Sequence, residues 1–589
     1  MITKMTKYTF LLLHSETEGF LREVQELGVL DLTRSRKPVD AVSGQLFREA
    51  EEIRHRIERI ERCDYARDEQ HAALSAQHDA VMAARSEKMQ WGDIDQAQRQ
   101  ELEKEGCHFH FYTVPAKRFK EQWLENYAIG IIGRDDKNVR FVLIDHASEE
   151  GHSLPLRETI LADETIDELF RKAESLEQAI SEREAQMQAQ KQEIPDLQRS
   201  YNKKIEELQR YLAKEGSERT AEDYISVMTG FAPTADDHRL QSELDRKNIY
   251  YISEPAKASD NPPIQLKNNW FARNFETLTG MYGMPVYDEF DPTPVLAPFF
   301  LLFWSFCMGD AGYGLLLILV GLLLDKVNIM GLRKHKRLVI SLGIGTAVIG
   351  FFLGTFFGIN LKEVSWIPAG LRRLMLVGKI QAGGSSYDIA MVAAIAIGVF
   401  HICLAMIIKA VGQTRRAGFR EAVSTWGWVV LIVGGLIVGA LALTQVLDTA
   451  ATKVAVIVVS VLSVLGIFIF NKPGRNPLLN VGAGLWDTYQ MATGILGDVL
   501  SYIRLYALGL AGGMLGAAFN NLGGMVLGGN PTWQWIPFVV IVLIGHALNF
   551  AMSCLGAFVH PLRLTFVEYF KNSGYEGKGS EYNPLKEIE

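Results

Sequence analysis

Hydrophobic and polar positions are distributed very unevenly along the chain. Residues 1–269 are rich in Glu, Lys, Arg, Gln and Asp, whereas from Pro294 onward long apolar runs alternate with short loops. Apolar runs of about 20 residues are typical of transmembrane helices. We therefore predict a soluble module joined to a polytopic α-helical membrane domain. The predicted bounds are 1–269 for the soluble module, 270–294 for a linker into the membrane, 295–570 for the membrane domain and 571–589 for a cytoplasmic tail.

The membrane domain contains eight candidate spans. They cover residues 295–307, 310–324, 337–358, 388–411, 422–446, 453–470, 485–520 and 535–569. The first two are shorter than the about 20 residues that a helix needs to cross a bilayer. They are joined by "MGDAGYG", so we expect either a tight hairpin or one broken helix.

The last two spans are unusually long. A helix from Trp486 to Asn520 would measure about 52 Å, whereas the hydrocarbon core of a bilayer is about 30 Å thick. These helices must therefore tilt strongly or project beyond the bilayer. A steeply tilted pair could lie along the curved wall of a neighbouring molecule.

The soluble module has an α+β pattern with two long helices. "KYTFLLLHSETEGFLREVQELGVLDL" predicts strand, amphipathic helix and strand, with Gly28 ending the helix, and "DYISVMTGFAPTADDHRLQSELDRKNIYYIS" predicts a second mixed unit. Between them, helices are expected at about 45–90 and 163–212, and strands at "CHFHFYTV" and "AIGIIGRDDKNVRFVLIDH".

Both long helices carry a seam of apolar residues at coiled-coil spacing. The first seam contains Ile53, Ile57 and Ile60, and the second contains Leu197, Tyr201, Ile205, Leu208 and Leu212. Pro195 predicts a kink in the second helix. We expect an antiparallel coiled coil with a small α/β lobe at each end. The alternative is two solvated helices folded on a compact core.

The distribution of basic residues predicts the orientation in the membrane. Lys and Arg are concentrated in loops 325–336, 412–421 and 471–484, whereas loops 447–452 and 521–534 contain none. By the positive-inside rule, both termini are cytoplasmic, although loop 359–387 also carries four basic residues. The N-terminal "TFLLL" is too short for the core of a signal peptide.

Composition and short motifs exclude several classes of function. The net charge is −8 and no basic stripe is evident, which argues against binding of nucleic acid. The five cysteines lack metal-binding spacing, and Cys107, His108 and His110 fit an alternating strand better than a metal site. No G-x-x-x-x-G-K-[ST] motif occurs, so the chain is not expected to hydrolyse ATP itself. We expect neither a cofactor nor a metal.

One cation lies inside an apolar run. Arg504 in "GDVLSYIRLYALGLAGGML" is followed by more than ten apolar or small residues. An arginine near the bilayer centre costs about 3 kcal/mol on insertion scales, so it requires a partner or a task. Its helical face also holds small residues such as Gly497 and Gly512, which allow another helix to approach closely.

A second cation lies in the last span. Arg563 in "FVHPLRLTFVEYF" follows His560 by one turn and precedes Glu568 by five residues. Its side chain could face the same partner as Arg504. Alternatively, it extends to the cytoplasmic interface and pairs with Glu568.

Four blocks of the sequence resemble one known family. They are "MYGMPVYDEFDPTP", "MGDAGYG", "SYIRLYALGLA" and "GAFVHPLRLTFVEYFKNSGYEGKGSEYNPL". In this order they resemble the stator membrane subunit of rotary V/A-type ATPases, which is called subunit a in vacuolar enzymes and subunit I in bacterial and archaeal ones. The resemblance covers nearly the whole chain.

The resemblance implies a role for the two arginines. In this family the two long final helices lie against a rotating ring of proteolipid subunits, each with a carboxylate in the membrane. Arg504 and Arg563 match the two arginines that face this carboxylate. The implied function is to couple H⁺ or Na⁺ translocation through two half-channels to rotation, and so to ATP hydrolysis or synthesis by partner subunits.

Polar residues near the arginines are candidates for lining the half-channels. They are Gln490, Asp498, Ser501, His546, Asn549, His560, Glu568 and, in the first hairpin, Asp310. For each of them the alternative is a hydrogen bond between helices. His401 is expected only to pack.

The resemblance also implies partners and a location. The partners are the proteolipid ring, coiled-coil subunits of the peripheral stalks at the lobes of the arm, the cap of the central stalk and, through the stalks, the catalytic ATPase head. The expected location is the inner (plasma) membrane of the cell.

Other classes of function fit part of the pattern. A secondary transporter or ion channel with a cytosolic regulatory domain would also carry Arg, Asp and His within the membrane. Duplicated halves and paired broken helices, which are typical of many transporters, are not evident in the sequence. A scaffold that only anchors a stalk would have no use for Arg504.

Overall fold

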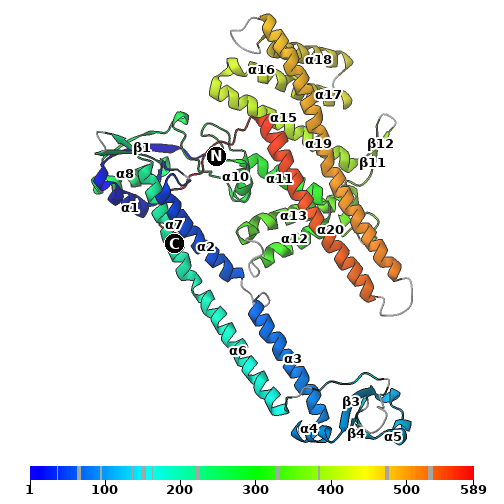
Figure 1. Cartoon of the computed structure of the whole chain (residues 1–589). Helices are drawn as coiled ribbons and strands as arrows, with labels where there is room; N and C mark the ends of the chain where they lie inside the picture. Colours follow the sequence, from blue (N-terminus) through cyan, green and yellow to red (C-terminus); the bar gives the residue numbers. More distant parts are fainter. Residues whose placement is uncertain are drawn as a thin grey trace. The chain divides into compact units, whose positions relative to one another are not determined.

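The computed structural model of the chain divides into two compact units (Figure 1). One comprises Met1–Thr33 and Ser217–Leu585, and the other comprises Arg34–Gly216 and Lys586–Glu589. The structure describes residues 1–588 except 36, 63–67, 93–95, 136, 147–153, 155, 162–163, 221–223, 325–331, 366, 383–384, 447, 471–476 and 528–534. Cys63, most of loop 325–336 and part of loop 471–484 therefore lie outside the described residues.

The first unit begins with a five-stranded antiparallel sheet. Its strands follow the order β2–β7–β1–β8, and β6 pairs with β7. They are β1 (Met5–Leu13), β2 (Asp31–Leu32), β6 (Glu218–Thr220), β7 (Ile225–Pro233) and β8 (Tyr251–Pro255). Strand β1 pairs with β7 along its whole length. The mixed α/β segments at the start and at the end of the soluble sequence therefore form one lobe.

Two helices accompany this sheet, α1 (Thr17–Leu27) and α8 (Asp237–Arg246). Each carries buried apolar residues on one face, including Leu21 in α1 and Leu244 in α8. Gly28 ends α1 in the left-handed region with a φ of 65°, as the sequence predicts.

The second unit contains four long helices where two were expected. They are α2 (Ala41–Arg62), α3 (Glu69–Trp91), α6 (Ile166–Gln192) and α7 (Ile194–Glu215). The single helix predicted at about 45–90 is wrong, because Asp68 has an extended backbone and its side chain caps α3 by accepting from His71 N. The predicted kink at Pro195 is a break at Glu193, since proline is tolerated in the first turn of the new helix.

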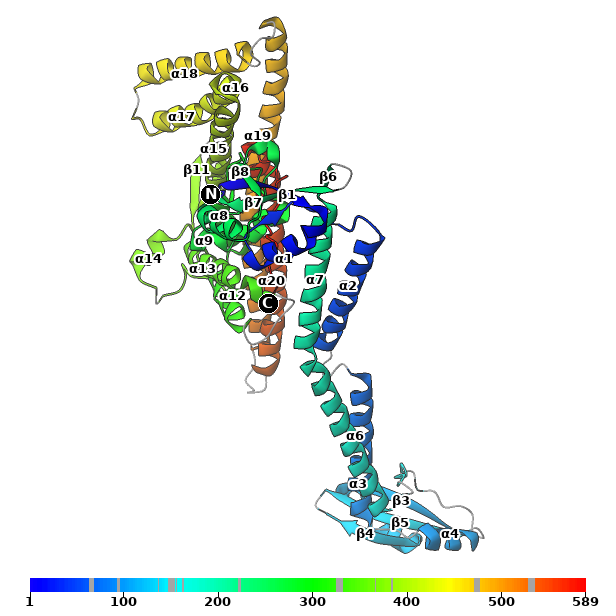
Figure 2. The same cartoon turned by 90° about the vertical axis from the view of Figure 1, so that its left-hand side faces the viewer.

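These helices form two antiparallel pairs, α2 with α7 and α3 with α6, as Figures 1 and 2 show. Ion pairs cross between them, with Arg56 bound to Glu193 at 2.9 Å and Arg183 bound to Asp68 at 2.6 Å. The Arg183 guanidinium holds the pKa of the Asp68 carboxyl below its usual value. The antiparallel pairing agrees with the sequence analysis, and the supercoil of a true coiled coil stays a prediction.

A three-stranded antiparallel sheet lies beyond the end of α3. Its order is β3 (Cys107–Pro115), β5 (Asn138–His146) and β4 (Ile129–Arg134). Two short helices accompany it, α4 (Gln96–Lys104) and α5 (Gln122–Asn126). Cys107, His108 and His110 lie along β3, so the interpretation of this segment as a strand is confirmed.

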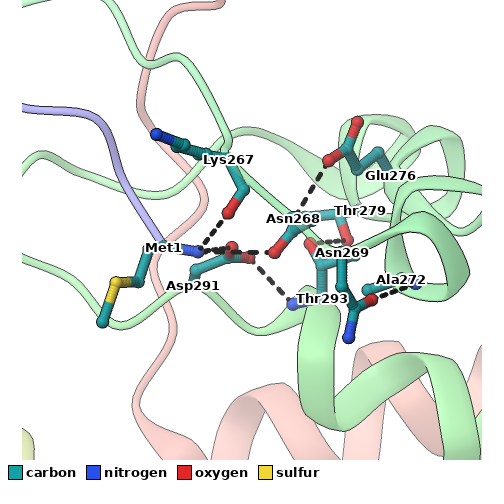
Figure 3. A network of polar contacts seen from close by, with 9 residues as sticks. All are labelled: Met1, Lys267, Asn268, Asn269, Ala272, Glu276, Thr279, Asp291 and Thr293. Atoms are coloured by element: carbon teal, nitrogen blue, oxygen red, sulfur yellow. Dashed lines mark hydrogen bonds and ion pairs between the residues drawn. The ribbon is translucent and has the colours of Figure 1, made fainter. Parts of the chain in front are cut away.

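The linker after the first lobe carries two short helices, α9 (Trp270–Arg273) and α10 (Glu276–Tyr282). Next to them the backbone nitrogen of Met1 binds Asp291 Oδ2 at 2.7 Å, and it also donates to Lys267 O and Asn268 Oδ1 (Figure 3). The other carboxylate oxygen of Asp291 accepts from Thr293 N at 3.0 Å. This buried aspartate thus joins the start of the first strand to the start of the first apolar helix.

Among the residues that the structure describes, six helical segments are long and apolar enough to cross a membrane. They are Lys336–Leu353 (α13), Ile389–Ala417 (α15), Phe419–Ala442, Thr449–Ile469, Asn480–Val526 (within α19) and Trp535–Ser573 (α20 and α21). The third contains α16 (Phe419–Val429) and most of α17 (Gly435–Leu443), and the fourth contains α18 (Thr449–Val464), each with a π-helical turn. In the loop between α13 and α15, the described residues form a short helix, α14 (Ala369–Leu374), and two hairpins, β9–β10 (Thr355–Phe356, Ile359–Asn360) and β11–β12 (Lys379–Ala382, Ser385–Asp388).

The first two predicted spans form a sharply bent pair. Helices α11 (Thr293–Met308) and α12 (Ala311–Leu323) meet at 120° around Gly309, which has a φ of 60°. Neither helix alone reaches the about 20 residues of a full span. Eight separate spans are therefore not confirmed, and the described residues provide six spans and one bent pair.

The last two spans are longer than predicted. Helix α19 runs from Pro477 to Val526, 50 residues and about 75 Å. The final segment runs without a break through α20 (Trp535–Arg563), a π-helical turn at Leu564–Tyr569 and α21 (Phe570–Ser573). The two segments lie side by side (Figure 1). Their contacts with α11 and α15 bury Phe300, Phe303 and Tyr502 in the core of the unit.

The tail returns to the first lobe. A β-bridge joins Glu581 to Ile264, and the backbone N–H of Leu585 donates to Leu30 O at 3.0 Å. The hydroxyl of Tyr582 donates to Val29 O. Both ends of this unit are therefore parts of one folded lobe.

Glycines allow α12 and α13 to approach closely, which generates a first prediction. A Cβ added at Gly343 would lie 2.8 Å from Ile318 N and 3.0 Å from Gly314 O. We expect Gly343→Ala to destabilise the folded chain by about 1–3 kcal/mol, because overpacking forces the helices apart. The measurement is thermal unfolding of the purified chain in detergent. The matched control is Gly439→Ala in α17, where no heavy atom lies within 4 Å, and equal melting temperatures for the two variants would contradict this packing.

Candidate functional site

Arg504 lies near the middle of α19, next to residues of the helix that pack in the core. Its neighbours Tyr502 and Leu505 are 0% and 1% exposed, and Arg504 itself is half-buried. Cys307, near the end of α11, is close enough to feel its charge. Across the described part of the chain, the Arg504 guanidinium forms no ion pair or hydrogen bond with another side chain.

Arg563 ends α20, directly before the π-helical turn, and its side chain is exposed. His560, one turn earlier, lies near both Arg504 and Arg563. An ion pair between Arg563 and Glu568, which the sequence left open, is not found among the residues that the structure describes. The two arginines thus share one neighbourhood, and neither forms an ion pair with a described carboxylate, although Arg563 lies near enough to Glu568 for their charges to interact.

A first polar cluster lies beside the arginines and contains Asp498, Ser501, Glu568 and Asn572. The amide of Asn572 donates to Asp498 Oδ2 at 2.7 Å and to Glu568 O at 2.7 Å. Asp498 and Ser501 lie close to the Glu568 carboxyl, which is 2% exposed. One oxygen of that carboxyl, Oε2, is buried without a partner in the described structure. This cluster therefore contains two carboxylates, and one oxygen of the Glu568 carboxylate has no hydrogen-bond partner among the described residues.

A second polar cluster lies on the other side of the arginines and contains His546, Asn549, Tyr313 and Asn520. The two ring nitrogens of His546 lie 2.8 Å from Tyr313 Oη and 3.0 Å from Asn520 Oδ1. The amide of Asn549 donates to Tyr313 Oη at 2.8 Å and to Gly512 O at 2.9 Å. These contacts connect α12, α19 and α20 by hydrogen bonds through an otherwise apolar region.

The positions of the two clusters follow from the antiparallel packing of α19 and α20. Asp498 precedes Arg504 on α19, and Glu568 follows Arg563 on the final segment, so these residues lie toward the same end. Gly512 follows Arg504, and Asn549 precedes Arg563, so this pair lies toward the other end. At 1.5 Å per residue, Asp498 and Gly512 are about 9 and 12 Å from Arg504 along the helix. The arginines therefore separate two polar groups.

Asp310 caps the bent pair. Its Oδ1 accepts from Gly312 N and Phe357 N, both at 2.8 Å, and from Tyr313 N at 3.2 Å. Its Oδ2 accepts from Gly358 N at 2.8 Å. Asp310 is 1% exposed, and hydrogen bonds from four backbone N–H groups stabilise its buried carboxylate. These contacts explain Asp310 as a structural anchor. A role of Asp310 in a half-channel stays a prediction.

The remaining candidates lie apart from the arginines. Gln490 is exposed on α19, about 21 Å from Arg504 along the helix. His401 is buried between the rings of Phe299 and Tyr569, with centroids at 4.2 and 4.7 Å, and its Nδ1 lies 3.0 Å from Tyr502 Oη. Packing of His401 agrees with the sequence analysis, which did not include its hydrogen bond.

Three residues of the clusters were missed by sequence reasoning. Tyr313 lies inside the block "MGDAGYG", and Asn520 was the last residue of a predicted span. Asn572 follows Glu568 by four residues, and this spacing places both on one helical face. The helical spacing was a usable signal for Asn572. Nothing in the sequence indicates that Tyr313 reaches His546, 233 positions away.

Comparisons with known proteins agree with the four-block resemblance. Residues 153–337 match the model of the V-type ATPase 116kDa subunit family. The chain is 31% identical over 371 residues to the A-type ATP synthase subunit I of Methanocaldococcus jannaschii, an alignment that covers 59% of the chain and 52% of that protein.

Further relatives carry the same description. The A-type ATP synthase subunit I of Pyrococcus abyssi is 31% identical over 404 residues, covering 65% of the chain and 58% of that protein. The V-type ATP synthase subunit I of Borreliella burgdorferi is 22% identical over 508 residues, covering 85% and 82%. The chain spans about half the length of the first two relatives. The resemblance to subunit I of V/A-type ATPases is confirmed.

The hydroxyl of Tyr313 generates the second prediction. It is the shared partner of His546 and Asn549 in a buried position. We expect Tyr313→Phe to lower the free energy of unfolding by about 1–2 kcal/mol, because buried polar atoms lose their partner. The measurement is thermal unfolding in detergent, with Tyr387→Phe on the exposed strand β12 as control. An unchanged melting temperature for Tyr313→Phe would show that these hydrogen bonds do not stabilise the fold.

Proposed function

We propose that this chain is the stator membrane subunit of a rotary V/A-type ATPase and that its last two helices guide H⁺ or Na⁺ past a proteolipid ring. Relatives named subunit I of A-type and V-type ATP synthases support the assignment. The main support for the mechanism is the environment of the Arg504 guanidinium. This side chain is half-buried in a long apolar helix, and it has no carboxylate partner in the described chain.

An unpaired guanidinium in this position requires a partner from outside the chain. Isolated charges in a medium of low dielectric constant are costly, and they persist where they pair or act. A carboxylate on a neighbouring subunit supplies the missing charge. Arg504 then favours the ionised form of that carboxylate, so that the bound ion leaves as the carboxylate arrives. Arginine suits this role because it stays protonated at every working pH.

The two polar clusters are the proposed half-channels. The cluster of Asp498, Ser501 and Glu568 serves one side of the membrane, and the cluster of His546 and Asn549 serves the other. The arginines between them prevent an ion from passing directly from one cluster to the other, since a fixed positive charge repels cations. Each ion must therefore travel on the ring from one cluster to the other, and this requirement couples transport to rotation.

Arg563 and His560 complete the barrier. Arg563 is exposed at the end of α20, and His560 lies near both arginines. A second cation widens the region in which the ring carboxylate is held ionised. The exposed apolar residues Leu510, Met514 and Leu555 on the two long helices supply a surface for the ring.

The second unit is the proposed attachment to the stalks. Its antiparallel helix pairs carry the three-stranded sheet at one end. Coiled-coil subunits of the peripheral stalk bind at the lobes of such an arm and resist the torque of the rotor. The cap of the central stalk is the third proposed partner, and partner subunits carry out the nucleotide chemistry.

We place both termini in the cytoplasm of the cell, with the six spans in the inner (plasma) membrane. Support for a common side comes from the tail, which pairs with Ile264 and Leu30 of the first lobe. A chain whose ends share one lobe crosses a membrane an even number of times. Because six is already even, the bent pair α11–α12 must add no crossing or two. It therefore either enters and leaves the membrane on the same side or crosses it twice, and it is not a single span.

The third prediction concerns transport. We expect Arg504→Ala to abolish ATP-driven ion transport by the assembled complex while leaving assembly intact, because the ring carboxylate loses the charge that drives off its ion. The measurement is ion uptake into vesicles that contain the purified complex. The control is Lys453→Ala, which changes an exposed residue in the first turns of α18. Normal pumping by the Arg504→Ala complex would contradict the mechanism.

The fourth prediction concerns orientation. In a chain without native cysteines, Ser259→Cys and Glu587→Cys are expected to react with a membrane-impermeant maleimide only in inverted vesicles. Ser386→Cys, in the hairpin between α13 and α15, is expected to react only from the outside of intact cells. All three positions are exposed. Labelling of Ser259→Cys and Glu587→Cys from opposite sides would contradict an even number of crossings.

A further inference from the structure

We propose that a cavity at the end of α15 binds the phosphate group of an anionic ligand, with Lys409 as its principal contact. The cavity has a volume of about 300 Å³. Its walls come from the last turns of α15, from the linker before α11 and from the turn after α21. The polar residues that line it are Lys409, Gln413, Arg416, Ser573, Glu289 and Glu576.

Lys409 is a half-buried lysine without a counterion. Its ammonium forms no ion pair or hydrogen bond in the portion of the chain that the structure describes. The charged group whose electrostatic interaction it feels is the ammonium of Lys571, which is also positive. A Cβ at Gly574 would lie 3.4 Å from Lys409 Cγ, so the stem of the lysine packs against the turn and holds the ammonium at the cavity.

The two carboxylates of the cavity do not supply the missing charge, because each already has partners. Glu289 accepts from Val286 N at 2.8 Å and from Glu576 N at 2.9 Å, and Arg416 Nη2 lies 3.9 Å from its Oε1. Glu576 pairs with Lys578 at 3.1 Å. Among the described residues, Lys409 and Lys571 are therefore left as a pair of positive charges without a counterion.

Stabilisation of helix ends explains only part of this arrangement. Cations in the last turn of a helix interact favourably with its dipole, which accounts for Arg416 in α15 and Lys571 in α21. Lys409 lies about 12 Å before the end of α15, beyond the reach of this effect. Its position inside a cavity indicates a ligand.

A phosphate ester fits the site in charge and in location. Arg415 and Arg416 lie in the last turn of α15 and Arg420 lies in the first turn of α16, within the segment 412–421 that the positive-inside rule assigns to the cytoplasm. Basic pockets between transmembrane helices on this side of a membrane bind the head groups of anionic lipids. The phosphate can belong to such a lipid or to a free phosphate ion, and two arms of one experiment separate these sources.

The experiment compares the full chain in nanodiscs of phosphatidylcholine with nanodiscs that also contain phosphatidylglycerol. We expect phosphatidylglycerol to raise the melting temperature of the wild-type chain and to remain bound after purification. Lys409→Gln is expected to weaken this binding about fivefold, because one lysine near the membrane surface contributes about that factor. In a second arm, inorganic phosphate is added to the phosphatidylcholine discs.

Two further variants keep the result interpretable. Lys409→Arg retains the charge and is expected to restore binding, and Lys453→Gln, on the other side of the membrane domain, is expected to behave as the wild type. A response of the wild type to inorganic phosphate alone, lost in Lys409→Gln, supports the same site with a free anion as ligand. If neither phosphatidylglycerol nor phosphate affects the wild type more than Lys409→Gln, the proposal is wrong. This result would leave the assignment of Arg504 unaffected.

Discussion

The membrane part of this chain is organised around a positive charge without a partner. Arg504 lies in an apolar helix, and no described carboxylate of its own chain neutralises it. A buried guanidinium that formed an internal ion pair would be a structural element, and one that reached the lipid headgroups would be solvated. Arg504 forms no ion pair with a described side chain of its own chain, and in the proposed function its charge is available to a group from another molecule. The polar clusters matter because they lie on either side of this charge.

The surrounding structure keeps the charge in place. The 50 residues of α19 form one continuous helix, so that Asp498, Arg504 and Gly512 hold fixed positions along it. Asp310 binds four backbone N–H groups and locks the bent pair α11–α12, from which Tyr313 reaches His546 and Asn549. The tail binds the first lobe and thereby fixes the end of the final segment. Rigid elements therefore position each member of the site, as the proposed stator role requires.

The sequence predicted the features that depend on local pattern. Hydropathy located the spans, and the cost of a charge in an apolar run was enough to identify Arg504. Features that depend on contacts between distant residues were missed, such as the pairing of β1 with β7 and the hydrogen bonds of Tyr313. Helix breaks were predicted only at Pro195 and at the glycine-rich "MGDAGYG". Asp68 ends the supposed long helix by capping the next one, and an aspartate in a charged segment gives little warning of this role. Asp310 was proposed for the half-channel because a carboxylate between apolar spans suggests function, but backbone donors surround it.

The most direct test of the central claim is a density map of the intact complex in its membrane. The quantity to measure is the distance from the Arg504 guanidinium to the nearest carboxylate, together with the chain to which that carboxylate belongs. We expect the nearest carboxylate to belong to a subunit of the ring. A permanent ion pair between Arg504 and a carboxylate of its own chain, such as Glu568, would contradict it.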